Sequence, residues 1–186
     1  SYMAVQKIVD EFKQSGADLI VACGGLAGTK LGGSMSGYKL LRSLGHRCTR
    51  LRPNLVQIKT DWPGIGALKG VRALCRAEIT CDGESWSCST GEIQFTEFGL
   101  SGPVIFEISR DVCQKKGDWV CTLDLLPQVS REHLLEMLCA RRATNLPASE
   151  LFTGILHNRL GRVLTQERGI RAADRIADLS DEALLR

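Results

Sequence analysis

Residues 71–79 alternate between apolar and more polar side chains, and no other feature of the sequence constrains the fold more tightly. The apolar positions are Val71, Ala73, Cys75, Ala77 and Ile79. A period of two is the pattern of a β-strand that buries one face and exposes the other. Asp82-Gly83 comes next, a pair that favours the tight turn of a β-hairpin. The sequence therefore predicts a second, antiparallel strand that begins at Glu84 and runs to Cys88.

Further short strand candidates follow this hairpin. They lie at residues 93–98, 104–109 and 119–125, and short extended runs flank Pro53. Glycine and proline separate these segments, as they do in domains built from many short strands. Residues 47–128 are therefore predicted to form an antiparallel β-barrel-like domain or a sandwich.

The first 46 residues follow a different pattern. Apolar residues between Val5 and Phe12 recur at helical spacing. Residues 17–23 form a continuous apolar run closed by Gly24-Gly25, which is typical of a strand buried on both faces of an α/β sheet. A serine at position 34 or 36 is expected to cap a second helix, and Gly45 is expected to end it.

Residues 129–186 are predicted to be helical. Ser130 is expected to cap one helix, apolar spacing predicts another over residues 148–168, and Ser180 is expected to cap a third. The whole chain is therefore expected to be an α+β protein in three parts.

Composition excludes several classes of protein. A net charge of +3, with lysines and arginines scattered along the chain, makes nucleic acid an unlikely partner. No apolar run approaches the ~20 residues of a membrane span, and no secretory signal opens the sequence. The eight cysteines contain no C-x-x-C pair, so no zinc or other metal site is expected. We expect them to be reduced, as in a cytoplasmic protein, and disulfides in a secreted protein are the alternative.

Two segments carry residues of chemical interest. Glycines after a buried strand, as at Gly24-Gly25, let a backbone approach a ligand, although an ordinary strand-to-loop turn is the simpler interpretation. The loop that follows is rich in glycine but matches neither G-x-G-x-x-G nor a phosphate-binding loop. Ser101 lies between Leu100 and Gly102 without the G-x-S-x-G context of a nucleophile, so it is interpreted as a turn serine. No catalytic residue is assigned.

Three runs of sequence resemble a bacterial FAD-dependent family that includes aminoacetone oxidase and related NAD(P)/FAD-dependent oxidoreductases. Residues 23–38 read C-G-G-L-A-G-T-K-L-G-G-S-M-S-G-Y and are similar to the family's A-T-G-G-x-S-x-P-x-T-G-S-T-G-D-G-Y signature. Residues 95–103, F-T-E-F-G-L-S-G-P, resemble its F-T-H-F-G-L-S-G-P, and residues 124–127 resemble its D-L-L-P. The resemblance extends from about Ala17 to the end of the chain.

The resemblance implies that the chain is a piece of a larger flavoprotein. Residues 1–46 would be a partial segment of an FAD-binding domain, and residues 47–128 and 129–186 would be a β-barrel-like insert and a helical insert that cover the substrate side of the flavin. Gly24, Gly25 and Gly37 would lie near the FAD. The partners would be the remaining FAD-binding segments of the same protein and a small-molecule substrate.

The resemblance also leaves an alternative open. Thr29, Ser36 and Glu97 stand where the family has proline, aspartate and histidine. These departures would suit a non-catalytic binding module that recognises a partner protein or nucleic acid. Because the sequence contains no G-x-G-x-x-G element, the chain by itself is not expected to retain FAD.

Overall fold

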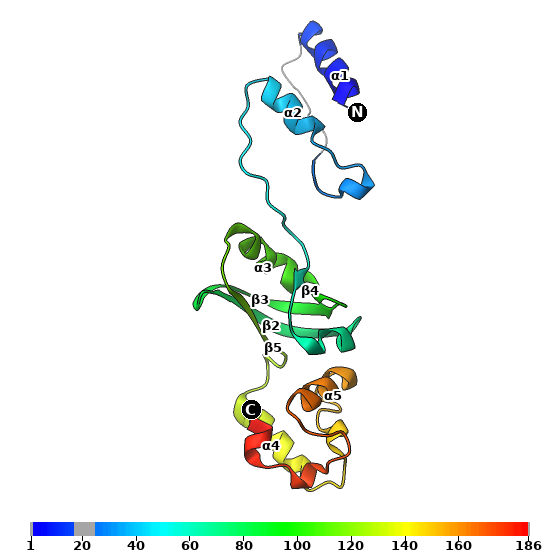
Figure 1. Cartoon of the computed structure of the whole chain (residues 1–186), viewed down its shortest axis with the longest axis vertical. Helices are drawn as coiled ribbons and strands as arrows, with labels where there is room; N and C mark the ends of the chain where they lie inside the picture. Colours follow the sequence, from blue (N-terminus) through cyan, green and yellow to red (C-terminus); the bar gives the residue numbers. More distant parts are fainter. Residues whose placement is uncertain (1, 17–24, 186) are drawn as a thin grey trace. The chain divides into compact units, whose positions relative to one another are not determined.

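The computed structural model describes residues 2–16 and 25–185, which form two compact units, Ser1–Leu51 and Arg52–Arg186. The strand predicted at residues 17–23, and Gly24 after it, lie outside the described residues. The three domains predicted with boundaries at residues 46/47 and 128/129 remain a prediction. Each unit is described by itself below (Figure 1).

The first unit contains the helices α1 (Tyr2–Gln14) and α2 (Ser36–Ser43), with a short 3-10 turn between them at Thr29–Leu31. The predicted helix over residues 5–12 is confirmed by α1. The predicted serine is not at the N-cap of α2, which is Met35, but the hydroxyl of Ser34 accepts a 3.3 Å hydrogen bond from the amide of Ser36, the first residue of the helix. Gly45 does end α2. Its φ of +89° places it in the left-handed region, and the amide of His46 then donates to the carbonyl of Leu41.

The second unit is built on one five-stranded sheet in which every neighbouring pair is antiparallel. The strand order is β1-β4-β3-β2-β5. The strands are β1 (Ile58–Lys59), β2 (Arg72–Cys81), β3 (Glu84–Phe95), β4 (Gly99–Ser101) and β5 (Trp119–Asp124). The predicted hairpin is confirmed, because Asp82 and Gly83 join β2 to β3 with φ of +53° and +85°, the two positive values of a type I′ turn. A 3-10 segment, η2 (Pro63–Leu68), precedes β2.

The predicted strand at residues 104–109 is wrong. These residues belong to helix α3 (Pro103–Gln114), which lies across the sheet (Figure 1). Pro103 stands at the first helical position, where its missing amide hydrogen is no loss. Val104, Ile105 and Ile108 are buried on one face of α3. A short apolar run in a window of six residues fits a buried strand and a buried helix equally well, and that ambiguity produced the error.

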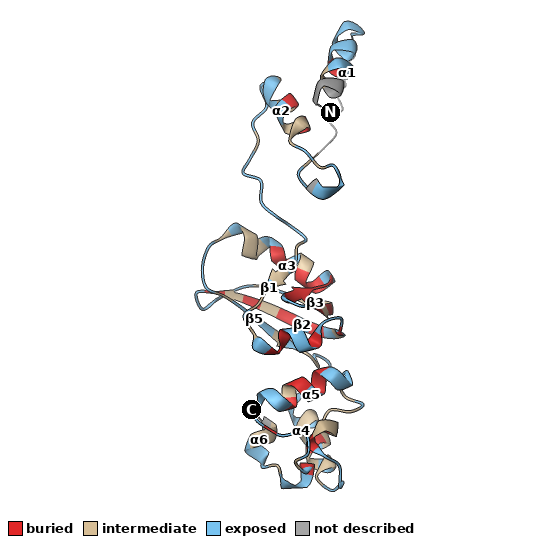
Figure 2. Ribbon diagram, turned by 45° about the vertical axis from the view of Figure 1, so that its right-hand side comes forward, coloured by how far each residue is buried: buried red, intermediate tan, exposed pale blue. Residues whose placement is uncertain are grey.

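The main core lies between α3 and one face of the sheet. Cys75, Ala77 and Ile79 of β2 are buried there, and the residues between them are more exposed, as the alternation predicted. Figure 2 shows the buried residues concentrated where α3 meets the strands. Leu160 and Val163 of the helical segment join the same core. The sheet and the helices after it are therefore parts of one packed unit.

The last part of the chain is helical, as predicted, but it is more broken than expected. It contains α4 (Arg131–Arg141), η3 (Ala148–Glu150), α5 (Asn158–Glu167), η4 (Ile176–Asp178) and α6 (Asp181–Leu185). The single helix predicted over residues 148–168 is wrong, because Gly154 adopts a φ of +78° and ends the first turns before α5 begins. The predicted caps are confirmed: the side chains of Ser130 and Ser180 accept hydrogen bonds from the amides of His133 and Ala183.

Three further expectations concern the fold class, a membrane span and the cysteines. The structure combines helices with an antiparallel sheet, which confirms the α+β fold class. No helix among the described residues is long and apolar enough to cross a membrane. The seven cysteines that the structure describes are free thiols, and Cys23 is outside the described residues.

Candidate functional site

The glycine-rich loop between residues 25 and 35 folds tightly back on itself. The amides of Leu31 and Gly33 both donate to the carbonyl of Gly28, whose φ is +63°. A Cβ atom added at Gly33 would overlap the carbonyl oxygen of Ala27 and would lie 2.9 Å from that of Gly25. The glycine at position 33 is therefore required by the packing of the loop itself, because any larger residue would force the backbone apart.

The two ends of this loop are brought together. An added Cβ at Gly25 would meet one described atom within 4 Å, the hydroxyl oxygen of Tyr38 at 3.9 Å. Tyr38 follows Gly37, which is buried in the first turn of α2. The hydroxyls of Ser34 and Ser36 lie 2.8 Å apart beside the same turn. The structure thus places Gly25 close to Tyr38, the residue after Gly37. Gly24 lies outside the described residues. That Gly24, Gly25 and Gly37 bind a cofactor stays a prediction.

The segment from Phe95 to Pro103 serves the architecture of the sheet. At Gly99 an added Cβ would overlap the carbonyl oxygen of Ile58 on β1, so glycine permits the close approach of β1 and β4. Ser101 pairs with Gln94 in the sheet and is 5% exposed. Neither His133, which pairs with Glu136, nor His157, which caps α5, contacts it. Ser101 is therefore a buried residue of strand β4, so the prediction of a turn serine is wrong.

Glu97, at the position where the resembling family has histidine, forms an ion pair with Lys69. Its carboxylate lies 2.7 Å from the ammonium group, and both side chains are more than half exposed. An exposed pair of this kind contributes little to stability. Glu97 therefore links the β3–β4 turn to the loop before β2 and shows no sign of acid–base chemistry.

A hollow of about 990 Å³ lies on the inner face of the sheet between the edge strands β1 and β5. Sequence analysis did not predict it. Its lining mixes apolar and aromatic side chains with the polar residues Lys59, Thr60, Asp61 and Asp118. The inward residues of β5 and the residues around β1 form much of the apolar wall: Trp119, Cys121, Leu123, Ile58 and Trp62. Such a surface can contact a ligand that has both an apolar part and polar groups.

The thiol groups near this hollow have low reactivity. Burial raises the pKa of Cys121 to about 11. Burial also raises the pKa of Cys75 to about 11, with further contributions from Cys121 and Asp124. Both groups are therefore protonated at neutral pH and are poor nucleophiles. Among the described residues, no group of three or more His, Cys, Asp or Glu side chains could hold a metal ion.

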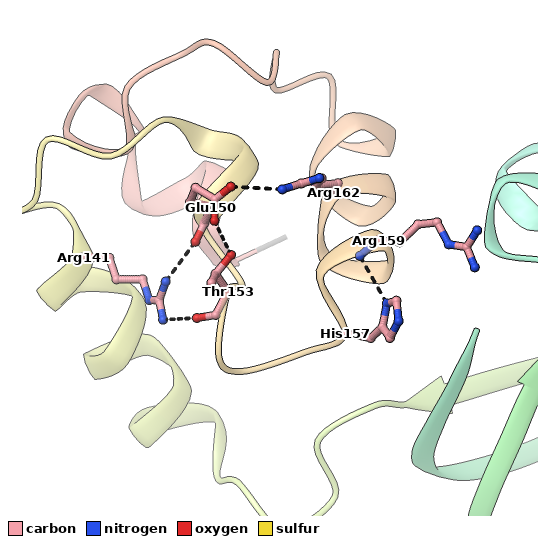
Figure 3. Close-up of polar contacts among 6 residues, drawn as sticks. All are labelled: Arg141, Glu150, Thr153, His157, Arg159 and Arg162. Carbon is pink, nitrogen blue, oxygen red and sulfur yellow. Dashed lines mark hydrogen bonds and ion pairs between the residues drawn. The ribbon is translucent and has the colours of Figure 1, made fainter. Parts of the chain in front are cut away.

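A polar network holds the helical part of the second unit together (Figure 3). Arg141 of α4 donates to the carbonyl oxygens of Glu150 and Thr153. The carboxylate of Glu150 accepts a 2.6 Å hydrogen bond from the hydroxyl of Thr153 and pairs with Arg162 of α5 at 3.1 Å. Glu150 thus joins the loop to α5, and these two contacts lower the pKa of its carboxyl group below the ordinary value.

We expect Glu150→Gln to lower the thermal midpoint at pH 7 and to lose this effect at low pH. A carboxylate with a depressed folded-state pKa stabilises the fold fully above its unfolded-state pKa, and the contribution disappears as pH falls through the folded-state value. Thermal unfolding of both proteins from pH 7 to pH 3 measures the difference. Glu84→Gln, at an exposed carboxylate of the β2–β3 hairpin, is the control. A difference that stays constant over this range would show that Glu150 acts through packing.

The second unit therefore defines a class: an antiparallel half-barrel crossed by one helix, followed by a compact helical segment. Residues 52–186 match the family model described as the HI0933-like protein barrel and H2TH domain, and the chain belongs to this family. The family assignment agrees with the resemblance found in the sequence.

Two curated proteins are similar to the chain. It is 30% identical over 147 residues, 76% of this chain, to the 3-dehydro-bile acid delta(4,6)-reductase of Clostridium scindens. It is also 30% identical over 117 residues, 63% of this chain, to the ribosomal RNA dihydrouridine synthase of Escherichia coli K12. The matched regions cover 36% and 28% of these two relatives, so the chain corresponds to about a third of each.

Proposed function

We propose that the chain is part of an FAD-dependent oxidoreductase in which the half-barrel and the helices cover the substrate side of the flavin. The observation that carries the proposal is the similarity to the bile acid reductase over 147 residues, together with membership of the HI0933-like family. When bound, the flavin would supply the redox chemistry, and the protein would orient the cofactor and the substrate.

The described residues support a cofactor position at one point of the glycine-rich loop. Among the described residues, only the hydroxyl of Tyr38 comes within 4 Å of the position where a Cβ of Gly25 would project, which would let a ligand approach the backbone there. Gly33 does not need a ligand to explain it, because the loop's own carbonyls fill that space. In this proposal Gly25 and the first turn of α2, with Gly37, border the FAD.

We expect the 186-residue chain to purify colourless, and a longer protein that contains it to carry FAD. The chain lacks the G-x-G-x-x-G element whose backbone amides hold a pyrophosphate at a helix N-terminus. The visible absorbance of each purified protein checks both statements. A longer protein without flavin would contradict the proposal and would favour the alternative of a binding module.

The role of Gly25 can be tested in the longer protein by flavin retention. Gly25→Ala should weaken FAD binding at least about tenfold, which is ~1.4 kcal/mol, by obstructing the approach to the backbone. Gly66→Ala is the matched control, since an added Cβ there would also have its nearest described neighbour at 3.9 Å, the carbonyl oxygen of Glu97. Equal flavin content in the two variants would remove Gly25 from the cofactor site without touching the family assignment.

The substrate can be approached with the same protein. The names of the two relatives point to two substrate classes, a bile acid and ribosomal RNA. Reoxidation of the reduced flavin by a representative of each class separates them. The hollow in the half-barrel offers Trp62 and Trp119 to a flat part of the substrate and Lys59, Asp61 and Asp118 to its polar groups.

A further inference from the structure

The positive charge of the chain is concentrated in one segment. Residues 19–60 contain seven of the 24 lysines and arginines and none of the 21 aspartates and glutamates. In the rest of the chain, the remaining 17 basic residues are outnumbered by those 21 acidic ones. The small net charge of +3 therefore conceals a strongly basic segment beside a weakly acidic remainder. The basic segment is defined by Lys30, Lys39, Arg42, Arg47, Arg50, Arg52 and Lys59.

The cations of the basic segment are available to a partner. All seven residues are exposed. Within residues 25–60, which the structure describes, none of the seven joins an ion pair, whereas carboxylates elsewhere pair with residues such as Lys69 and Arg72. Arg52 donates a hydrogen bond to the backbone carbonyl of Cys113, which leaves its charge uncompensated. Exposed cations that no carboxylate neutralises attract an anionic partner.

The geometry of the segment favours a polymeric anion over a compact one. Residues 46–57 form neither helix nor strand. The seven cations are spread over the 30 residues from Lys30 to Lys59. A single pyrophosphate can contact only a few of these cations. A chain of phosphates can contact all of them, with the release of one condensed counterion at each contact.

We propose that the basic segment binds the phosphate backbone of a nucleic acid. Four of its seven cations are arginines, whose forked donors match phosphate oxygens. A membrane surface would instead require cations and apolar anchors on opposite faces of a longer helix. The only α-helix of the basic segment within residues 25–60 is α2, with eight residues, and it carries two of the seven cations. The expectation that nucleic acid is an unlikely partner rested on the net charge of +3 and on the scatter of the lysines and arginines, and it did not consider that residues 19–60 contain no acidic residue.

The test measures binding of the 186-residue chain to fluorescently labelled oligo(rU) and oligo(dT) by anisotropy over a series of KCl concentrations. Arg42→Gln/Arg47→Gln/Arg50→Gln removes three contacts from side chains that make no hydrogen bond or ion pair among the described residues. We expect at least about tenfold weaker binding at low salt. The slope of the logarithm of the association constant against log[KCl] should become shallower by about 2, because each of the three lost phosphate contacts contributes ~0.7 to it.

Two further variants distinguish the effect of the basic segment on affinity from the effect of the total charge of the chain. Arg110→Gln/Arg131→Gln/Arg168→Gln removes the same charge from exposed positions outside the basic segment and should bind within about twofold of the wild type. Replacement of Arg42, Arg47 and Arg50 by lysine keeps the charge and should retain most of the affinity. Circular dichroism checks that every variant is folded.

The possible outcomes decide between partners. Equal affinity for the two oligonucleotides supports recognition of the backbone, and a preference for one identifies which nucleic acid is bound. The inference is overturned if neither oligonucleotide binds with salt-dependent affinity, or if the control variant loses as much affinity as the first. Binding to phosphatidylserine vesicles without binding to either oligonucleotide also overturns it. The measurement involves no flavin, so its result is independent of the proposed redox function.

Discussion

Gly102→Val is expected to destabilise the second unit by about 2–6 kcal/mol. Gly102 precedes α3 with φ of +100° and ψ of 170°, a backbone conformation that residues other than glycine essentially never adopt. An added Cβ would lie 2.8 Å from the carbonyl oxygen of Glu92 and 3.0 Å from the amide nitrogen of Gln94. Backbone strain costs about 1–3 kcal/mol. The collision adds a similar amount, because β3 is held in the middle of the sheet and cannot yield.

The control for this variant lies one residue away. Ser101→Ala keeps the backbone and removes a hydroxyl from a 5% exposed side chain, so we expect a change within about 1 kcal/mol. Urea denaturation midpoints of the two variants give the comparison. The Ser101→Ala variant of the longer protein should also show unchanged flavin reduction. Lost turnover with intact fold and flavin content would make Ser101 catalytic and would contradict a purely structural role for this residue of β4.

The parts of the sheet that could be predicted from the sequence are those that depend only on residues close together in the chain. The alternation from Val71 to Ile79 survives in β2 because one face of that strand packs against α3 while the other faces outward. The Asp82-Gly83 turn could be predicted because positive φ at both positions is a local requirement. Helix α3 could not be predicted in the same way, because residues 104–109 are buried through a contact with β2 and β3 that local sequence does not reveal.

The candidate site also has features that local sequence predicts and features that depend on long-range contacts. Glycines of the loop could be singled out in the sequence, since tight turns and close approaches need them. The hollow between β1 and β5 could not be predicted, because Trp62 and Trp119 line the same hollow only when the strands are paired in the order β1-β4-β3-β2-β5. The sequence shows the charge of the basic segment, but the net charge of the whole chain conceals it because the acidic residues elsewhere offset it. What matters for binding is where the unpaired cations lie.

Phe95→Ala and Phe98→Ala should differ by several kcal/mol in stability although the two phenylalanines lie three residues apart. Phe95 ends β3 with 1% of its surface exposed and is among the largest fully buried side chains of the core. Phe98 follows in the β3–β4 turn and is 66% exposed. Removal of a buried phenylalanine ring costs about 3–5 kcal/mol through lost burial and the cavity left behind, and removal of an exposed one costs less than about 0.5 kcal/mol.

The pair isolates the contribution of the side chain. The backbone hydrogen bonds of Phe95, from its amide to Val71 and from the amide of Gly70 to its carbonyl, remain possible after substitution by alanine. The same holds for the bond from the amide of Thr60 to the carbonyl of Phe98. A whole domain is stable by about 5–15 kcal/mol, so Phe95→Ala should remove a large fraction of the stability of the second unit. Urea denaturation of both variants measures the difference. If both lost stability equally, Phe98 would have to be buried in the folded chain, and its exposed position after β3 would be wrong.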